Sequence, residues 1–214
     1  MVVMRIDIRF WTAIVLIGIC GFAVARGWSI VLFSVAADAL KNPAEIAQAW
    51  SSTPGVASTA LETEVTDKID PSDLTAANNR REQLSAILSI KPLSSYDWLS
   101  LSGMLLVTDE PMQQVLESLA LSVLTGPNEG YVMAERGIFG VSLWESLSPD
   151  RKNRAAMDLA MGRIAVLGEV RERLRVVLSS KTEQVRSELK NALLATGVSP
   201  KEIEQRLGLK VVGE

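Results

Sequence analysis

The stretch SSYDWLSLSGMLLVTDEPMQQVLESLALSVLTGP, residues 94–127, decides the fold that we predict for this chain. Its apolar side chains recur at the spacing of two amphipathic helices separated by the polar sequence TDEP. Ser94 or Ser95 is expected to cap the first helix. Pro111 suits the first turn of the second, because a backbone N–H is not needed there. The chain is therefore expected to double back as a helical hairpin.

Polar turns divide the remainder of the chain after Asp38 into further short helices. Proline or glycine interrupts the apolar pattern near residues 54, 71, 92, 127, 149 and 197, which leaves helices of about 12 to 16 residues. No stretch alternates apolar and polar residues for long enough to indicate a strand. The predicted fold is therefore all-α. Helices are predicted over 42–50, 56–69, 74–90 and 131–144, with a last short helix opened by a capping box at Ser199 and Glu202.

An apolar run over residues 10–37, interrupted only by Arg26, precedes the helical part of the chain. A run of this length is typical of a segment that spans a lipid bilayer. Because Arg5 and Arg9 come before it, we expect a single-pass inner-membrane protein with a cytoplasmic N-terminus and a periplasmic C-terminal domain. The alternative is a signal peptide cleaved after Ala25, which would leave a soluble periplasmic domain.

Composition excludes several kinds of chemistry. The 214 residues include no histidine, so neither a Ser-His-Asp triad nor a histidine-containing zinc site is available. Cys20, the single cysteine, lies in the apolar run and is no candidate nucleophile. The chain carries a net charge of −3, and the three arginines and one aspartate of residues 1–37 leave −5 for the rest. An acidic domain of this kind is not expected to bind nucleic acid, and we predict no catalytic, metal-binding or cofactor-binding residue.

The candidate binding residues lie in a charge-dense pattern that begins at Arg151. Between residues 150 and 190, ten Lys or Arg accompany six Asp or Glu, a net charge of +4 within an acidic domain. Arg163, Arg171 and Arg175 are predicted to share one helix face, away from the apolar stripe that contains Leu167. Since arginine holds carboxylate or phosphate through paired hydrogen bonds, this face is the predicted partner-binding surface. The alternative is a solvated helix face with ion pairs between successive turns.

Residues 125–130, TGPNEG, have the composition of a phosphate-binding loop but lack its Gly-Lys-Ser/Thr ending. They also follow a predicted helix, whereas such loops follow a strand. We therefore predict a turn between two helices, with Gly126 as the C-cap of the first and Asn128 as the N-cap of the second.

The central helices resemble a tetratricopeptide repeat, a helical hairpin of about 34 residues with the order W-x2-L-G-x2-Y, a small residue and a proline. The resemblance covers residues 94–149 and implies an array of hairpins that leaves a concave face free for a partner. Ser102 stands where glycine is usual, and an irregular helical bundle is the alternative. Trp98 and Trp144 are predicted core anchors of adjacent hairpins. The positions that carry the resemblance are Trp98, Leu101, Ser102, Leu105, Leu119, Ala120, Gly126 and Pro127.

The apolar run and the predicted helices together divide the chain into two parts. Residues 1–37 are the predicted cytoplasmic leader and membrane anchor, and residues 38–214 the extracytoplasmic all-helical domain. Within that domain, N-terminal helices occupy 38–92, tetratricopeptide-like hairpins 93–149, and charged C-terminal helices 150–214.

The segment LTGPNEGYVMAERGIFGVSLWESL, residues 124–147, extends the resemblance to the layout of the whole chain. Together with the predicted anchor, it is similar to small single-anchor bacterial proteins encoded among genes for exopolysaccharide or O-antigen export and polymerisation. That resemblance implies a helical accessory protein in envelope polysaccharide assembly, without catalytic residues or cofactors.

The expected function is accordingly a non-catalytic, membrane-anchored scaffold or adaptor in exopolysaccharide or O-antigen assembly. Its expected partners are the inner membrane and other envelope-assembly proteins, with acidic glycan or phospholipid head groups as candidate ligands. One alternative is a general subunit of an envelope or secretion-system assembly. Another is a carboxylate-dependent glycan-cleaving enzyme, which would use Glu129 with Glu135, or Asp109 with Glu110.

Overall fold

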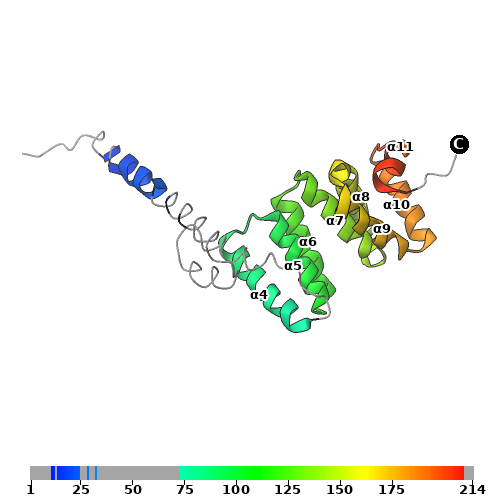
Figure 1. The fold of residues 1–214 in the computed structure, drawn as a ribbon, viewed down its shortest axis with the longest axis horizontal. Helices are drawn as coiled ribbons and strands as arrows, with labels where there is room; N and C mark the ends of the chain where they lie inside the picture. Colours follow the sequence, from blue (N-terminus) through cyan, green and yellow to red (C-terminus); the bar gives the residue numbers. More distant parts are fainter. Residues whose placement is uncertain (1–10, 13, 25–27, 29–31, 33–72, 210–214) are drawn as a thin grey trace, which may run out of the picture.

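The computed structural model describes Trp11, Thr12, residues 14–24, Trp28 and Leu32 near the start of the chain, and residues 73–209 (Figure 1). Residues 14–24 are helical and exposed. Among all these residues, no helix is both long and apolar enough to cross a bilayer. Part of the predicted anchor, including residues 25–27 and 33–37, lies outside the described residues, and the predicted helices over 42–50 and 56–69 lie wholly outside them.

Within residues 73–209 the chain is all-α, as predicted, and contains no strand. Short 3-10 turns interrupt it twice, and its last helical segment is a single π turn. The elements in order are α4 (Leu74–Ile90), α5 (Ser95–Val107), α6 (Met112–Thr125), α7 (Gly130–Ser142), η1 (Trp144–Ser146), α8 (Pro149–Gly162), η2 (Arg163–Ala165), α9 (Gly168–Ser179), α10 (Glu183–Ala195), α11 (Pro200–Glu202) and η3 (Ile203–Leu207).

Side-chain caps fix two of the predicted helix starts. The Ser94 hydroxyl accepts a hydrogen bond from the backbone N–H of Asp97, at the start of α5. The Ser199 hydroxyl accepts one from the backbone N–H of Glu202, at 3.3 Å, as expected of a capping box. Each bond satisfies a backbone donor that has no partner inside its helix. The sequence therefore located both helix starts correctly.

The turn between α6 and α7 confirms one predicted cap and corrects the other. Gly126 is the C-cap of α6, and a side chain there would collide with the Ser95 side chain of α5. The N-cap of α7 is Glu129, not Asn128, and its side chain bonds no backbone N–H of the helix. Its carboxylate instead accepts a hydrogen bond from the Ser95 hydroxyl at 2.6 Å. A tertiary contact has thus replaced the local cap.

The helices pack as successive hairpins. α5 packs on α6 and α7 on α8, while α4 covers α5. Alternate helices also meet, because α7 contacts both α5 and α9, and α10 packs on α8. In Figure 1 the helices follow one another across the domain in chain order, from α4 to the C-terminal helices. Each hairpin therefore rests mainly on its neighbours in the sequence.

The tightest contact joins α7 and α8 through small residues. A Cβ at Gly137 would lie 2.7 Å from the backbone nitrogen of Leu159, and one at Gly140 would lie 2.5 Å from the Cβ of Ala155. Glycine at both positions lets the two helix backbones approach closely, at the expense of some helix propensity. Trp144 and Leu159, which are 1% and 0% exposed, fill the core beside this contact.

A polar cluster joins η1, α8 and α10. The Trp144 indole N–H donates to Glu188 Oε2 at 3.0 Å, and the Lys152 ammonium donates to the same oxygen at 2.9 Å. Gln184 donates to the other carboxylate oxygen, also at 3.0 Å. These donors, Lys152 first, then Trp144 and Gln184, lower the pKa of Glu188 to about 2. The cluster also gives the buried indole the hydrogen-bond partner it needs.

The structure corrects the predicted helix over 131–144. The helix ends at Ser142, and Trp144 lies in the 3-10 turn that follows. Trp144 is buried, as predicted, but Trp98 is only half-buried and donates its indole N–H to the Pro92 carbonyl at 2.8 Å. The turn at η1 brings Trp144 under α10, which a continuous helix would not do.

Two apolar patterns are also less regular than predicted. On α6, Leu119 and Val123 are only half-buried and Ala120 is exposed. Between α8 and α9 the chain is broken by η2, and Leu167 is 57% exposed. The break is completed by Gly168, whose φ of +52° is readily adopted only by glycine. The charge-dense pattern is therefore divided among α8, η2 and the helices that follow.

We predict that Gly137→Ala destabilises the full chain by about 1–3 kcal/mol, because the new methyl group would force α7 away from the backbone of Leu159. Gly103→Ala in α5 is the matched control. No atom lies within 4 Å of the added Cβ there, so alanine should stabilise by about 0.5–1 kcal/mol. Urea unfolding monitored by tryptophan fluorescence measures both changes. Equal effects at the two positions would show that the α7–α8 contact is not tight.

We also predict a pH dependence from Glu188. Its pKa is lower in the folded chain than in the unfolded chain, so the ionised carboxylate stabilises the fold at and above about pH 4.5. That stabilisation is lost as the pH falls from about 4.5 through about 2. Glu188→Gln should therefore be less stable than the wild type at pH 6, and the difference should disappear near pH 2. Unfolding curves at a series of pH values test this, and a difference that is independent of pH would contradict it.

Candidate functional site

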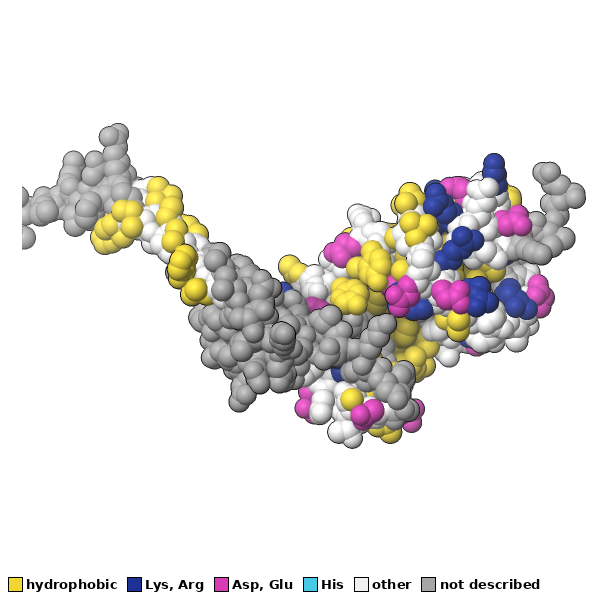
Figure 2. All heavy atoms as spheres, in the orientation of Figure 1, with side chains coloured by type: hydrophobic (Ala, Val, Ile, Leu, Met, Phe, Trp, Pro, Cys, Tyr) yellow, Lys and Arg dark blue, Asp and Glu magenta, His cyan; other side chains and the backbone are white. Residues whose placement is uncertain are grey.

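A groove of about 840 Å³ lies between α9 and α10. The groove exists because its two walls rest on different neighbours, α9 chiefly on α7 and α10 on α8. Leu207 and Leu209, at the end of η3, close its floor together with Leu178. Figure 2 shows that basic and acidic side chains gather over these C-terminal helices.

The α9 wall carries two of the predicted binding residues. Arg171 and Arg175 lie four residues apart and both line the groove. Arg175 donates from Nε to Glu172 Oε2 at 2.9 Å, within its own helix, and this bond lowers the pKa of Glu172. Arg171 is exposed and forms no ion pair or side-chain hydrogen bond with any described residue. The α9 wall thus presents one unpaired guanidinium beside a paired one.

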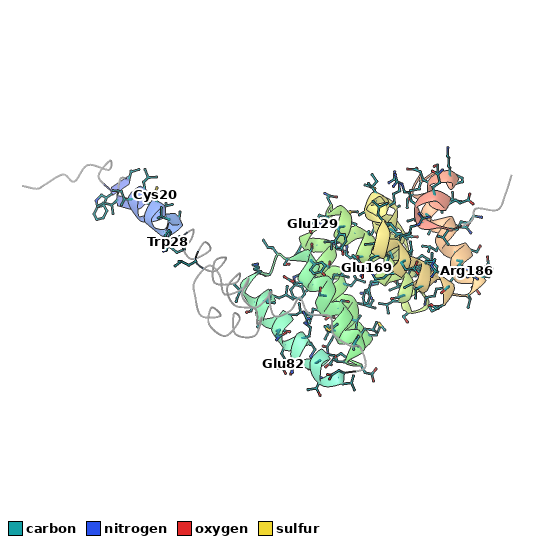
Figure 3. The ribbon with its side chains drawn as sticks, in the orientation of Figure 1. Cys20, Trp28, Glu82, Glu129, Glu169 and Arg186 are labelled. Carbon is teal, nitrogen blue, oxygen red and sulfur yellow. The ribbon has the colours of Figure 1, made fainter. Side chains whose placement is uncertain are left out.

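The α10 wall also carries two basic residues at helical spacing. Arg186 and Lys190, again four residues apart, line the opposite side of the groove. Arg186 donates from Nε to Glu183 Oε2 at 3.1 Å, an i,i+3 pair like that of Arg175. Figure 3 labels Arg186 on this outer helix and Glu169 near the start of α9. Four basic and two acidic side chains therefore line the groove, with a net charge of +2.

Arg163, the third predicted residue, lies elsewhere. It belongs to η2, and its Nε donates to Glu202 Oε1 of α11 at 3.1 Å, while Nη1 donates to the Ala160 carbonyl at 2.8 Å. The hydrogen bond from Arg163 also lowers the pKa of Glu202. The predicted common face for the three arginines is therefore not present, because the break at η2 separates Arg163 from α9.

Arg186 and Lys190 were missing from the predicted site. Their spacing repeats that of Arg171 and Arg175, and this was the available signal. This spacing alone could not place Arg186 and Lys190 in the site. Two basic residues at i and i+4 do not reveal which neighbour their helix packs against. The two walls face each other because α9 packs on α7 and α10 packs on α8.

The groove is suited to an acidic, partly apolar ligand. Guanidinium groups bind carboxylate or phosphate through two parallel hydrogen bonds. The i,i+3 ion pairs of Arg175 and Arg186 are largely exposed, and such pairs contribute only about 0–1 kcal/mol. An acidic partner could therefore take the place of Glu172 or Glu183 in these ion pairs at little energetic cost. The apolar floor would contact the non-charged part of the same ligand.

The carboxylates considered for catalysis have different surroundings. Glu135 forms an ion pair with Arg173 of α9, whereas Glu129 accepts from Ser95 of α5. Glu110 pairs with Arg81 of α4, and the adjacent Asp109 is exposed. Within the described ranges, no three acidic or cysteine side chains gather as a metal-ligand group.

Comparison with known proteins gives no family for this chain. It matches no family model, no curated protein sequence and no solved structure.

Proposed function

We propose that this protein is a non-catalytic, membrane-anchored scaffold or adaptor in cell-envelope polysaccharide assembly. The α9–α10 groove would hold an acidic partner, either a segment of another assembly protein or an acidic glycan. The observation that carries the proposal is the groove itself, in which basic residues from two helices face each other above an apolar floor.

The helix arrangement supports the scaffold part of the proposal. α5, α7 and α9 begin at Ser95, Gly130 and Gly168, intervals slightly longer than the roughly 34 residues of a tetratricopeptide repeat. Ser102, at the position of the usual glycine, is fully buried, and its hydroxyl donates to the Val115 carbonyl of α6 at 2.7 Å. A small residue at this crossing lets the two helices of the hairpin approach. Arrays of this kind commonly present a surface to a partner.

The envelope location rests on the sequence before residue 38. The proposal has the apolar run over 10–37 as an uncleaved anchor, with Arg5 and Arg9 on the cytoplasmic side. The groove would then lie in the periplasm, close to the site of envelope polymer assembly.

This topology predicts that a C-terminal alkaline phosphatase fusion is active and sediments with membranes. An inactive fusion would place the domain in the cytoplasm and contradict the proposal. An active fusion in the soluble fraction, with Arg26 as its N-terminus, would instead show cleavage after Ala25 and remove the anchor from the proposal.

We further predict that Arg171→Glu with Arg175→Glu prevents the protein from restoring polysaccharide output in a strain that lacks it. Both side chains are exposed, so the fold should be retained, while the net charge of the groove changes from +2 to −2. The amount and chain length of the surface polymer provide the measurement. The effect should be weaker at high ionic strength in any reconstituted binding assay.

Lys201→Glu with Arg206→Glu is the matched control, since it makes the same change in charge at exposed positions outside the groove. It should restore polymer output fully. The proposal would be contradicted if the folded groove variant performed as well as this control, or if loss of the protein left the polymer unchanged.

A further inference from the structure

A second hollow lies between α6 and α8, and it is independent of the basic groove. We call it the Arg136 cleft. Leu116, Leu119, Ala120 and Val123 of α6 form its apolar wall. Arg136 of α7 and Asp158 of α8 line its interior, and Arg151 and Arg154 also border it. Its volume is about 170 Å³, close to the roughly 150 Å³ of a cavity that accommodates benzene.

The charge in this cleft is not balanced. Arg136 and Asp158 are 1% and 2% exposed, and Arg136 Nε donates to Asp158 Oδ2 at 3.1 Å. Arg154 Nη2 lies 3.0 Å from the other oxygen of the same carboxylate. One buried carboxylate therefore serves two guanidinium groups, of which that of Arg136 is buried and that of Arg154 is 37% exposed. With Arg151 at the border, three positive charges and one negative charge line the cleft.

The hydrogen bonds of Arg136 are also incomplete. Its Nη1 donates to the backbone carbonyls of Ser122 and Gly126, each at 2.9 Å, so with Nε three of its five N–H groups are used. Its Nη2 is shielded from solvent and has no hydrogen-bond partner among the described residues, and the same is true of Arg154 Nε and of the acceptor Asp158 Oδ1. An unmatched donor in a buried site weakens the fold.

We propose that the Arg136 cleft binds an apolar group that carries a carboxylate. The apolar part would lie against the half-buried α6 wall, and its size would be about that of a six-carbon chain or ring. The carboxylate would accept hydrogen bonds from Arg136 and Arg154 and would neutralise the excess charge. A free carboxylic acid offers this chemistry, and so does an apolar residue at the C-terminus of a polypeptide.

The test uses the full chain with hexanoate as the probe and hexanamide as its neutral match. Methyl NMR signals of Leu119 and Val123 report binding at the cleft itself. We expect saturable shifts with hexanoate and at least about tenfold weaker binding of hexanamide, since a hydrogen bond to a charged group is lost. A short peptide ending in leucine, with either a free carboxylate or an amide at its C-terminus, then distinguishes the two sources. Stronger binding by either free acid supports the proposal.

Three variants locate the interaction. Ala120→Phe fills the exposed side of the cleft and should abolish the hexanoate shifts, and Arg154→Gln should weaken binding about tenfold. Neither variant removes Arg136, whose loss could unfold the chain. Arg171→Gln, in the α9–α10 groove, should leave binding unchanged. Equal binding of hexanoate and hexanamide, absence of saturation, or full retention of the shifts in Ala120→Phe would overturn the proposal.

Discussion

The placement of the central helices depends on the buried guanidinium of Arg136. It projects from α7, bonds two carbonyls at the C-terminal end of α6, and pairs with Asp158 of α8. The last carbonyls of a helix have no partner inside it and carry a partial negative charge, so a cation is well placed there. One side chain thus fixes the end of one helix relative to two others. Removing it would leave Asp158 with only the half-exposed Arg154 as a partner.

Polar contacts link the α5–α6 hairpin to the next one. Besides Arg136, which bonds carbonyls of α6, the Ser95 hydroxyl of α5 donates to Glu129 at the start of α7. The Ser122 hydroxyl donates to the Ser95 carbonyl at 2.6 Å within the α5–α6 hairpin. Hydrogen bonds of this kind specify position more narrowly than apolar contacts, because a buried donor or acceptor without its partner is penalised. By contrast, α7 and α8 meet through glycine and alanine. The domain therefore combines close backbone contact within the α7–α8 hairpin with directional bonds both within hairpins and between them.

The sequence predicted those parts of the fold that local chemistry decides. The all-α class, the starts at Ser94 and Ser199 and the end at Gly126 follow from capping and turn preferences. The sequence failed where tertiary contacts compete with a local pattern. Glu129 occupies the N-cap position of α7 in place of Asn128 and accepts a hydrogen bond from Ser95, and Trp144 lies beyond the end of α7, beside Glu188.

The candidate site shows the same limit. The sequence could predict that Arg171 and Arg175 share one helix face, because helical periodicity determines it. The sequence could not show that Arg163 bonds Glu202, thirty-nine residues away, or that Arg186 lines the groove. Both depend on how distant helices pack. Periodicity also predicted a buried α6 face, and it carries no information about the opening beside α8. A pattern of apolar residues predicts which face of a helix is buried, but not how completely it is buried.

The close approach of α7 and α8 has a mechanical consequence for the groove. α9 rests on α7 and α10 rests on α8, so each wall of the groove is carried by one of two helices that meet at Gly137 and Gly140. A small rotation at that contact would therefore change the spacing between the arginines of α9 and the basic residues of α10. Because that contact leaves no room even for a methyl group, the α7–α8 pair holds the two walls at one spacing, and the width of the groove is set by packing outside it.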